Sequence, residues 1–160
     1  MKKKVCMRGF IAILIAAVVF FAGCSQEQLI EFALENALRA AVDAAVAENE
    51  DAAKVMAHME KRIDLKVVSS EITQSGVTAD CRVSSPDLTG FVESFHANDY
   101  ATRAELVDAI CKAVDTAPIT THEMTLGFRV TESGYDLIDI EDFLEAYSGG
   151  SFEILQDMQK

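Results

Sequence analysis

Directly after residue 24, the apolar residues have the spacing of an α-helix. Residues 26–47 are Leu, Ile, Phe, Val or Ala except at Gln26, Glu27, Gln28 and Asn36 and at a polar stripe with four-residue spacing. The stripe consists of Glu31, Glu35, Arg39 and Asp43. This pattern predicts a long amphipathic helix with a narrow solvated face and a wide buried face, in which Glu35 can pair with Arg39. We expect the wide face to lie across a sheet; a subunit interface or a membrane contact is the alternative.

Local signals place the ends of this helix and predict a second one. Ser25 and Gln28 have the spacing of a capping box at the helix start. The polar sequence ENED at residues 48–51 is expected to break the helix. A second helix is predicted over residues 52–62, with Val55, Met56 and Met59 facing inward.

Apolar and polar residues then alternate, which predicts strands. Residues 63–68 and 77–83 alternate on either side of a turn at 73–76, so a β-hairpin is expected there. A second hairpin is expected from residues 121–130 and 135–138. In the strand 77–83 one face is apolar and consists of Val77, Ala79, Cys81 and Val83.

Three more helix starts are visible in the sequence. Ser85 followed by Pro86 has the order of a capping residue and a first-turn proline, and this predicts a helix through Phe91, Val92 and Phe95. Thr102 and Glu105 have the spacing of a capping box. Asp139 is expected to cap the last helix, which a Ser-Gly-Gly sequence ends.

The order of these elements is two helices, a hairpin, two helices, a hairpin and a helix. It predicts the α+β class, with one four-stranded antiparallel sheet whose inner face is covered by helices. We expect residues 24–160 to form a single domain, because no low-complexity linker and no repeat interrupts them.

The segment before this domain has the features of a signal peptide. Three lysines at positions 2–4 precede an uninterrupted apolar run over residues 10–22, which is shorter than the roughly 20 residues that a spanning helix needs. The sequence FAGC at 21–24 places small residues directly before Cys24. It resembles the lipobox of bacterial lipoproteins, in which the cysteine is lipidated on sulfur and becomes the new N-terminus.

We therefore expect residues 1–23 to be removed and Cys24 to hold the protein on the extracytoplasmic face of the cell membrane. A plain secretory signal cut at another site, or an uncleaved anchor, is the alternative. Four of the 14 Lys and Arg residues lie in the segment 1–23, which leaves 10 against 26 Asp and Glu and a formal net charge of −16. A surface this acidic repels phosphate backbones, so no nucleic-acid partner is expected, and no polybasic patch remains to bind a membrane.

Few residues in the sequence are candidates for catalysis, metal binding or ligand binding. The histidines His58, His96 and His122 lie far apart and lack metal-ligand spacing, so surface or core-edge positions are expected for them. The acid-rich residues 136–145 lack the spacing of a calcium loop. No catalytic motif, cofactor site or metal site is expected.

His122 is the candidate for ligand binding, because it shares a strand face with Met124, Leu126 and Phe128 at the expected mouth of the sheet's concavity. Two functions follow. The first is a non-catalytic envelope protein that binds a partner protein or small ligand. The second is a small enzyme in which His122 and one acid form an acid–base pair. The acid would be Asp80, Asp136 or Glu123.

Cys81 and Cys111 are the free thiols that remain after Cys6 is removed and Cys24 is lipidated. We expect two buried, unreactive thiols. A disulfide is the alternative, since an exported domain can meet an oxidising compartment.

Residues 60–150, from LKVVSSEITQSGVTADCRVSSPDL to EMTLGFRVTESGYDLIDIEDFLEAYSGG, resemble the small cystatin-like lipoproteins of Gram-positive bacteria. That family belongs to the superfamily of nuclear-transport-factor-2-like cone folds. Its members usually have Trp-Lys-Ile-Asp after the final turn, where this chain has Tyr-Asp-Leu-Ile-Asp at 135–139. The resemblance implies a cone-shaped α+β fold and an envelope location, and it carries over no catalytic residue.

Overall fold

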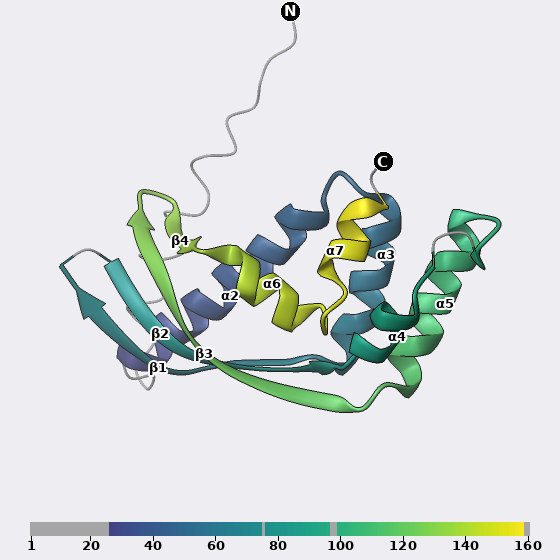
Figure 1. The fold of residues 1–160 in the computed structure, drawn as a ribbon. Helices are drawn as coiled ribbons and strands as arrows, with labels where there is room; N and C mark the ends of the chain where they lie inside the picture. Colours follow the sequence, from purple (N-terminus) through teal and green to yellow (C-terminus); the bar gives the residue numbers. More distant parts are fainter. Residues whose placement is uncertain (1–25, 75, 97–98, 159–160) are drawn as a thin grey trace, which may run out of the picture.

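The computed structural model describes residues 26–74, 76–96 and 99–158. Six helices, one 3-10 turn and four strands follow one another in the described residues (Figure 1). In chain order they are α2 (Gln26–Val46), α3 (Glu50–Met59), the 3-10 turn η2 (Glu60–Arg62), β1 (Asp64–Thr73), β2 (Gly76–Pro86), α4 (Thr89–Ser94), α5 (Arg103–Thr116), β3 (Ile119–Thr131), β4 (Gly134–Ile138), α6 (Ile140–Tyr147) and α7 (Phe152–Asp157).

The four strands form one antiparallel sheet in the order β1-β2-β3-β4. This confirms the predicted α+β class, both hairpins and the long helix before the sheet. The apolar row of β2 faces the core, where Val77, Ala79, Cys81 and Val83 are at most 3% exposed. Figure 1 shows the helices on one side of the sheet or beyond its right-hand end, and no described helix covers the other side.

Helix α2 lies against the two edge strands of the sheet, β1 and β4. Leu34, Leu38 and Val42 are buried, with the four-residue spacing of a single stripe. The expected wide buried face is wrong, because Phe32 is 65% exposed and Ala40 is also exposed. Ile30, Ala37 and Ala45 are partly buried against the core beside this stripe, whereas the far side of the helix stays in solvent.

Glu35 does not form the predicted ion pair with Arg39. Its carboxylate accepts a hydrogen bond of 3.0 Å from the backbone N–H of Val67. β1 is an edge strand, and outward-facing N–H groups of an edge strand have no neighbouring strand to accept their hydrogen bonds. The side chain of a neighbouring helix therefore accepts from one backbone donor at the sheet edge.

The break between α2 and α3 is fixed by Asn49, which is buried. Its side-chain oxygen accepts from the backbone N–H groups of Asp51 and Ala52, which caps α3. Its amide nitrogen donates to the carbonyl of Leu155 in α7, at 3.1 Å. The cap of one helix thus also holds the C-terminal helix. In α3 the predicted inward residues Val55, Met56 and Met59 are buried.

Ser85 and Pro86 do not start a helix, which corrects the prediction. Both belong to the end of β2, and α4 begins at Thr89. The Ser85 hydroxyl is buried and donates to the carbonyl of Ala146 in α6, at 2.7 Å. β2 is held to the segment between α6 and α7 as well, because the Leu88 N–H donates to the carbonyl of Gly149.

The other two predicted caps differ in outcome. Thr102 caps α5, with its hydroxyl accepting from the Glu105 N–H at 3.2 Å. Asp139 precedes α6 in a left-handed conformation, φ 56°, and makes no capping hydrogen bond. α6 is not the last helix, since α7 follows it. Ser25 and its predicted capping box lie outside the described residues, as does Cys24.

Candidate functional site

The outer face of the sheet is the side opposite the helices, and it is the candidate site. Strand register places two rows of polar side chains across three strands of this face. Lys66, Arg82 and Glu123 form one row; Ser69, Asp80 and Thr125 form the next. Ser69 follows a register shift after Val67, so Val68 is an extra residue in β1.

The carboxylate of Asp80 is fixed by two hydroxyl groups. Its Oδ1 accepts from the Thr125 hydroxyl at 2.7 Å and its Oδ2 accepts from the Ser69 hydroxyl at 2.9 Å. These two hydrogen bonds, the one from Thr125 first, lower the pKa of Asp80 below its ordinary value because they stabilise the charged form. Asp80 is therefore an ionised acceptor held in one orientation.

The neighbouring row carries opposite charges. Nε and Nη2 of Arg82 both donate to one carboxylate oxygen of Glu123, at 3.2 and 2.9 Å. Lys66 lies directly across from Arg82, so two cations stand side by side at this point. Exposed ion pairs of this kind stabilise a fold by about 1 kcal/mol or less, so these side chains are available for recognition.

Two members of each row line a hollow of about 440 Å³ on the outer face. Val68, which is 49% exposed, supplies an apolar wall beside the charged groups. The side chains from the outer face that line the hollow are Val68, Asp80, Arg82, Glu123 and Thr125. Fixed donors and acceptors around an open apolar spot suit the binding of a polar surface. Cys81 and Met124, which belong to the inner face, complete the lining of the hollow.

His122 lies on the other face of the sheet. Its cross-strand neighbour is Val83, in the inner row, and the His122 side chain itself is exposed. The three acids considered as its partners, Asp80, Asp136 and Glu123, alternate onto the outer face, so the structure does not bring any of them to His122. The predicted face that His122 shares with Met124, Leu126 and Phe128 is present.

A different acid lies close enough to His122 to interact with it. Asp87 follows β2 and accepts hydrogen bonds from the backbone N–H and hydroxyl of Thr89 and from the hydroxyl of Thr120. The contacts with Thr89, and to a smaller extent Thr120 and His122, lower the pKa of Asp87. Its carboxylate thus forms hydrogen bonds with Thr89, the first residue of α4.

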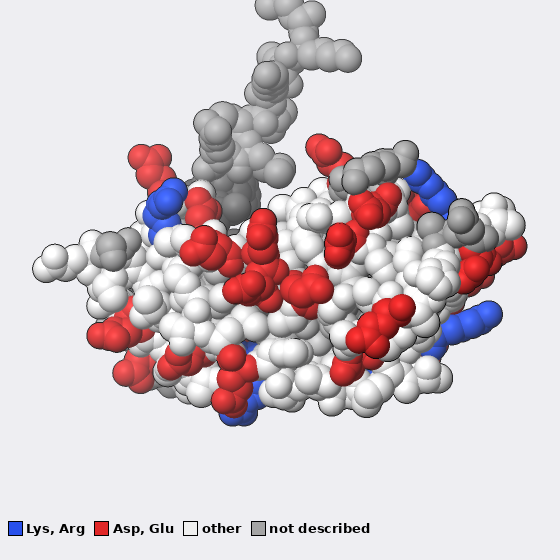
Figure 2. All heavy atoms as spheres, viewed as in Figure 1, with Lys and Arg blue, Asp and Glu red and all other residues white. Residues whose placement is uncertain are grey.

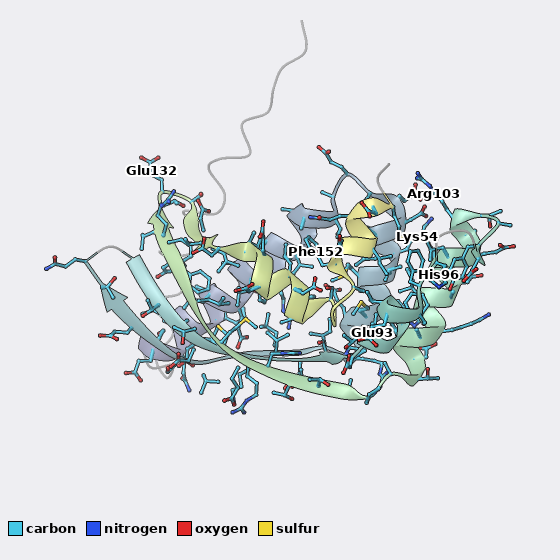
Figure 3. All side chains as sticks on the ribbon, in the orientation of Figure 1. Lys54, Glu93, His96, Arg103, Glu132 and Phe152 are labelled. Atoms are coloured by element: carbon cyan, nitrogen blue, oxygen red, sulfur yellow. The ribbon has the colours of Figure 1, made fainter. Side chains whose placement is uncertain are left out.

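One histidine–carboxylate contact was not predicted at all. Nε2 of His58 in α3 lies 2.8 Å from Oδ1 of Asp115 in α5. Beside it Arg62 donates to the carbonyls of Val114 and Ala117. The two contacts hold α3 against α5, and their partners are more than 50 residues apart in the sequence, so no spacing signal reveals them. His96 is exposed at the right-hand end of the view in Figure 3.

The predicted thiols differ from one another. Cys81 is 2% exposed, and burial, followed by the charges of Asp80 and Glu35, raises the pKa of its thiol to about 11. Cys111 is half-buried, which corrects the prediction for it, and burial is also the first cause that raises its pKa. Both thiols are free.

We predict that alkylation of the native mature domain at mildly alkaline pH labels Cys111 and not Cys81. The thiolate is the reactive species, and Cys81 is both inaccessible and protonated under these conditions. Denaturation without reductant should then expose the second thiol, and mass spectrometry counts the labels. A native domain labelled at both thiols would contradict the burial of Cys81, and a denatured domain labelled at neither would indicate a disulfide.

No group of three or more potential metal ligands occurs among the residues that the structure describes. Within that same part of the chain, no helix has the length and hydropathy needed to cross a bilayer. Comparison with protein-family models, curated protein sequences and solved structures gave no match.

Proposed function

We propose that this is a lipid-anchored protein of the bacterial cell envelope whose single domain binds a partner through the outer face of its sheet. The partner is an envelope protein or a ligand with both acidic and basic groups. In this proposal the domain has no catalytic role. The observation that carries the proposal is the uncovered outer face, with its fixed Asp80 carboxylate and the Arg82–Glu123 pair around one hollow.

The anchor is proposed from the first 24 residues. A basic start, a short apolar run and small residues before Cys24 are the features that lipoprotein processing requires. A mature net charge of −16 makes electrostatic attachment to anionic headgroups unfavourable, so a covalent lipid is the attachment that fits the rest of the chain.

Partner binding is favoured over catalysis because of where the reactive groups lie. His122 and the acids of the outer face are on opposite sides of the sheet, so they form no acid–base pair. The outer face instead offers a carboxylate, a guanidinium and an ammonium group at fixed strand positions. Such a surface recognises charged and hydrogen-bonding groups by complementarity.

We also infer that the sheet closes around α2 in the manner of a cystatin-like cone. Support comes from the contacts of α2 with both edge strands, which fit a helix held in the concavity of a curved sheet. The hydrogen bond from Val67 to Glu35 is one such edge contact.

We expect a photoreactive amino acid at Lys66 or at Thr78, both on the outer face, to crosslink to one and the same partner in intact cells. The same group at Lys112 in α5 or Glu153 in α7, which are exposed on the helix side, is the matched control. Crosslinked products are to be compared by electrophoresis and identified by mass spectrometry.

Asp80→Ala in the crosslinking background should weaken the product without unfolding the domain, because the Asp80 side chain is exposed. Equal products from the control positions, or no product from either outer-face position, would contradict the proposed binding face.

A further inference from the structure

Three large apolar side chains are exposed at one end of the molecule. Phe32 in α2 and Ile72 in β1 are each 65% exposed, and Val130 in β3 is 60% exposed. Figure 1 shows the first turns of α2, the end of β1 and the end of β3 on the left side of the view, while α4 and α5 form the right end. We call the three residues Phe32, Ile72 and Val130 the apolar end.

Two of these residues belong to the inner face of the sheet. Ile72 lies across from Val77 and Val130 lies across from Tyr135, so both side chains follow the register of the core. Val77 is 3% exposed, whereas Ile72 beside it is open to solvent. The inner face therefore extends beyond the cover that the described helices provide.

The proposed lipid is attached close to this end. Cys24 precedes Gln26, the first residue of α2, by two residues, and two residues of extended chain span at most about 7 Å. Phe32 lies six residues further, which is about 9 Å along the helix axis. A lipid on Cys24 would hold the start of α2 at the bilayer surface, because only Ser25 separates the two in the sequence.

We propose that the apolar end of the domain contacts the bilayer, with Phe32, Ile72 and Val130 in the interfacial region. This inference rests on the proposed lipid anchor. The bilayer would cover the part of the inner sheet face that the helices leave open. The outer face, with its hollow, would remain accessible to a partner.

Hydrophobic contact and the lipid, not charge, hold this orientation. Glu27, Glu71 and Glu132 are exposed at the same end, and Glu132 stands at the tip of the second hairpin in Figure 3. The acidic residues visible in Figure 2 are spread over the whole face shown, so this face offers no basic patch to anionic lipid. Insertion of apolar side chains into the interface lowers the free energy in proportion to the apolar area that they bury.

The test places an environment-sensitive fluorophore at single positions of the lipidated protein. F32C, I72C and V130C are labelled in a C111S background and bound to vesicles of phosphatidylethanolamine and phosphatidylglycerol that contain a nitroxide-bearing lipid. I119C is the matched control, because Ile119 is a large apolar residue, 47% exposed, at the other end of β3. We expect several-fold stronger quenching and a blue-shifted emission at the three positions relative to I119C.

Equal quenching at all four positions would overturn the proposed orientation while leaving the lipid anchor intact. Flotation of the protein with the vesicles is measured in the same samples, and a protein that fails to float overturns both proposals. Sedimentation in detergent adds a third outcome. A dimer whose labels at the three positions are shielded would show that a second copy, and not the bilayer, covers the apolar end.

Discussion

Cys24→Ala is expected to abolish incorporation of labelled palmitate and to leave residues 1–23 attached to the protein. The sulfur of Cys24 is the proposed site of lipid attachment, and the cut that follows requires a lipid-bearing cysteine directly after Ala22 and Gly23. The variant should therefore accumulate as a precursor. Radiolabelling and electrophoretic mobility measure both effects in the same cells.

Two other cysteines provide the controls for this experiment. Cys6 lies inside the segment whose removal is proposed, and Cys111 lies in α5 of the domain. Cys6→Ala and Cys111→Ala should both incorporate palmitate as the native chain does. Incorporation into the Cys24 variant, or its loss in either control, would contradict the assignment of the lipid to Cys24.

Gly149→Ala should lower the free energy of unfolding by about 3–5 kcal/mol, which is a large part of the stability of a domain this size. Gly149 has φ 61°, a left-handed conformation that costs a residue with a β-carbon about 1–2 kcal/mol. A β-carbon there would also lie 1.8 Å from the carbonyl oxygen of Pro86. β2 and the segment between α6 and α7 would have to separate, with loss of the hydrogen bond from Leu88 to Gly149.

Gly90→Ala is the matched control, because a β-carbon at Gly90 meets no atom within 4 Å and the residue lies in helix α4. Its effect should be close to zero or slightly stabilising. Urea unfolding of the two variants, followed by circular dichroism, gives the comparison. A Gly149 variant as stable as the Gly90 variant would show that the contact with Pro86 is not close in solution.

Periodicity was sufficient to predict the elements that bury one regular face. The apolar row of β2 and the inward residues of α3 follow directly from spacing, and both are found in the core. The errors occur where a tertiary contact replaces a local one. Glu35 bonds to the edge of β1 instead of Arg39, and Ser85 bonds to α6 instead of capping a helix. Local patterns carry no information about such distant partners.

The candidate site was predictable only in part, for the same reason. Alternation assigns Asp80 and Arg82 of β2 to the outer face, but strand register is needed to place Thr125 and Glu123 beside them. The extra residue Val68 in β1 changes that register by one position, and no feature of the sequence around it indicated a bulge. His122 was placed on the correct face of β3, whereas its charged neighbour Asp87 comes from the end of another strand.

The most direct test of the proposed function is the mass of the N-terminal peptide of the protein isolated from the membranes of its own cells. We predict a peptide that begins at Cys24 and carries a diacylglycerol-type modification on the cysteine sulfur, with residues 1–23 absent. An unmodified N-terminus at another residue, or a peptide that still contains residues 1–23, would contradict the lipid anchor and with it the envelope location proposed for the domain.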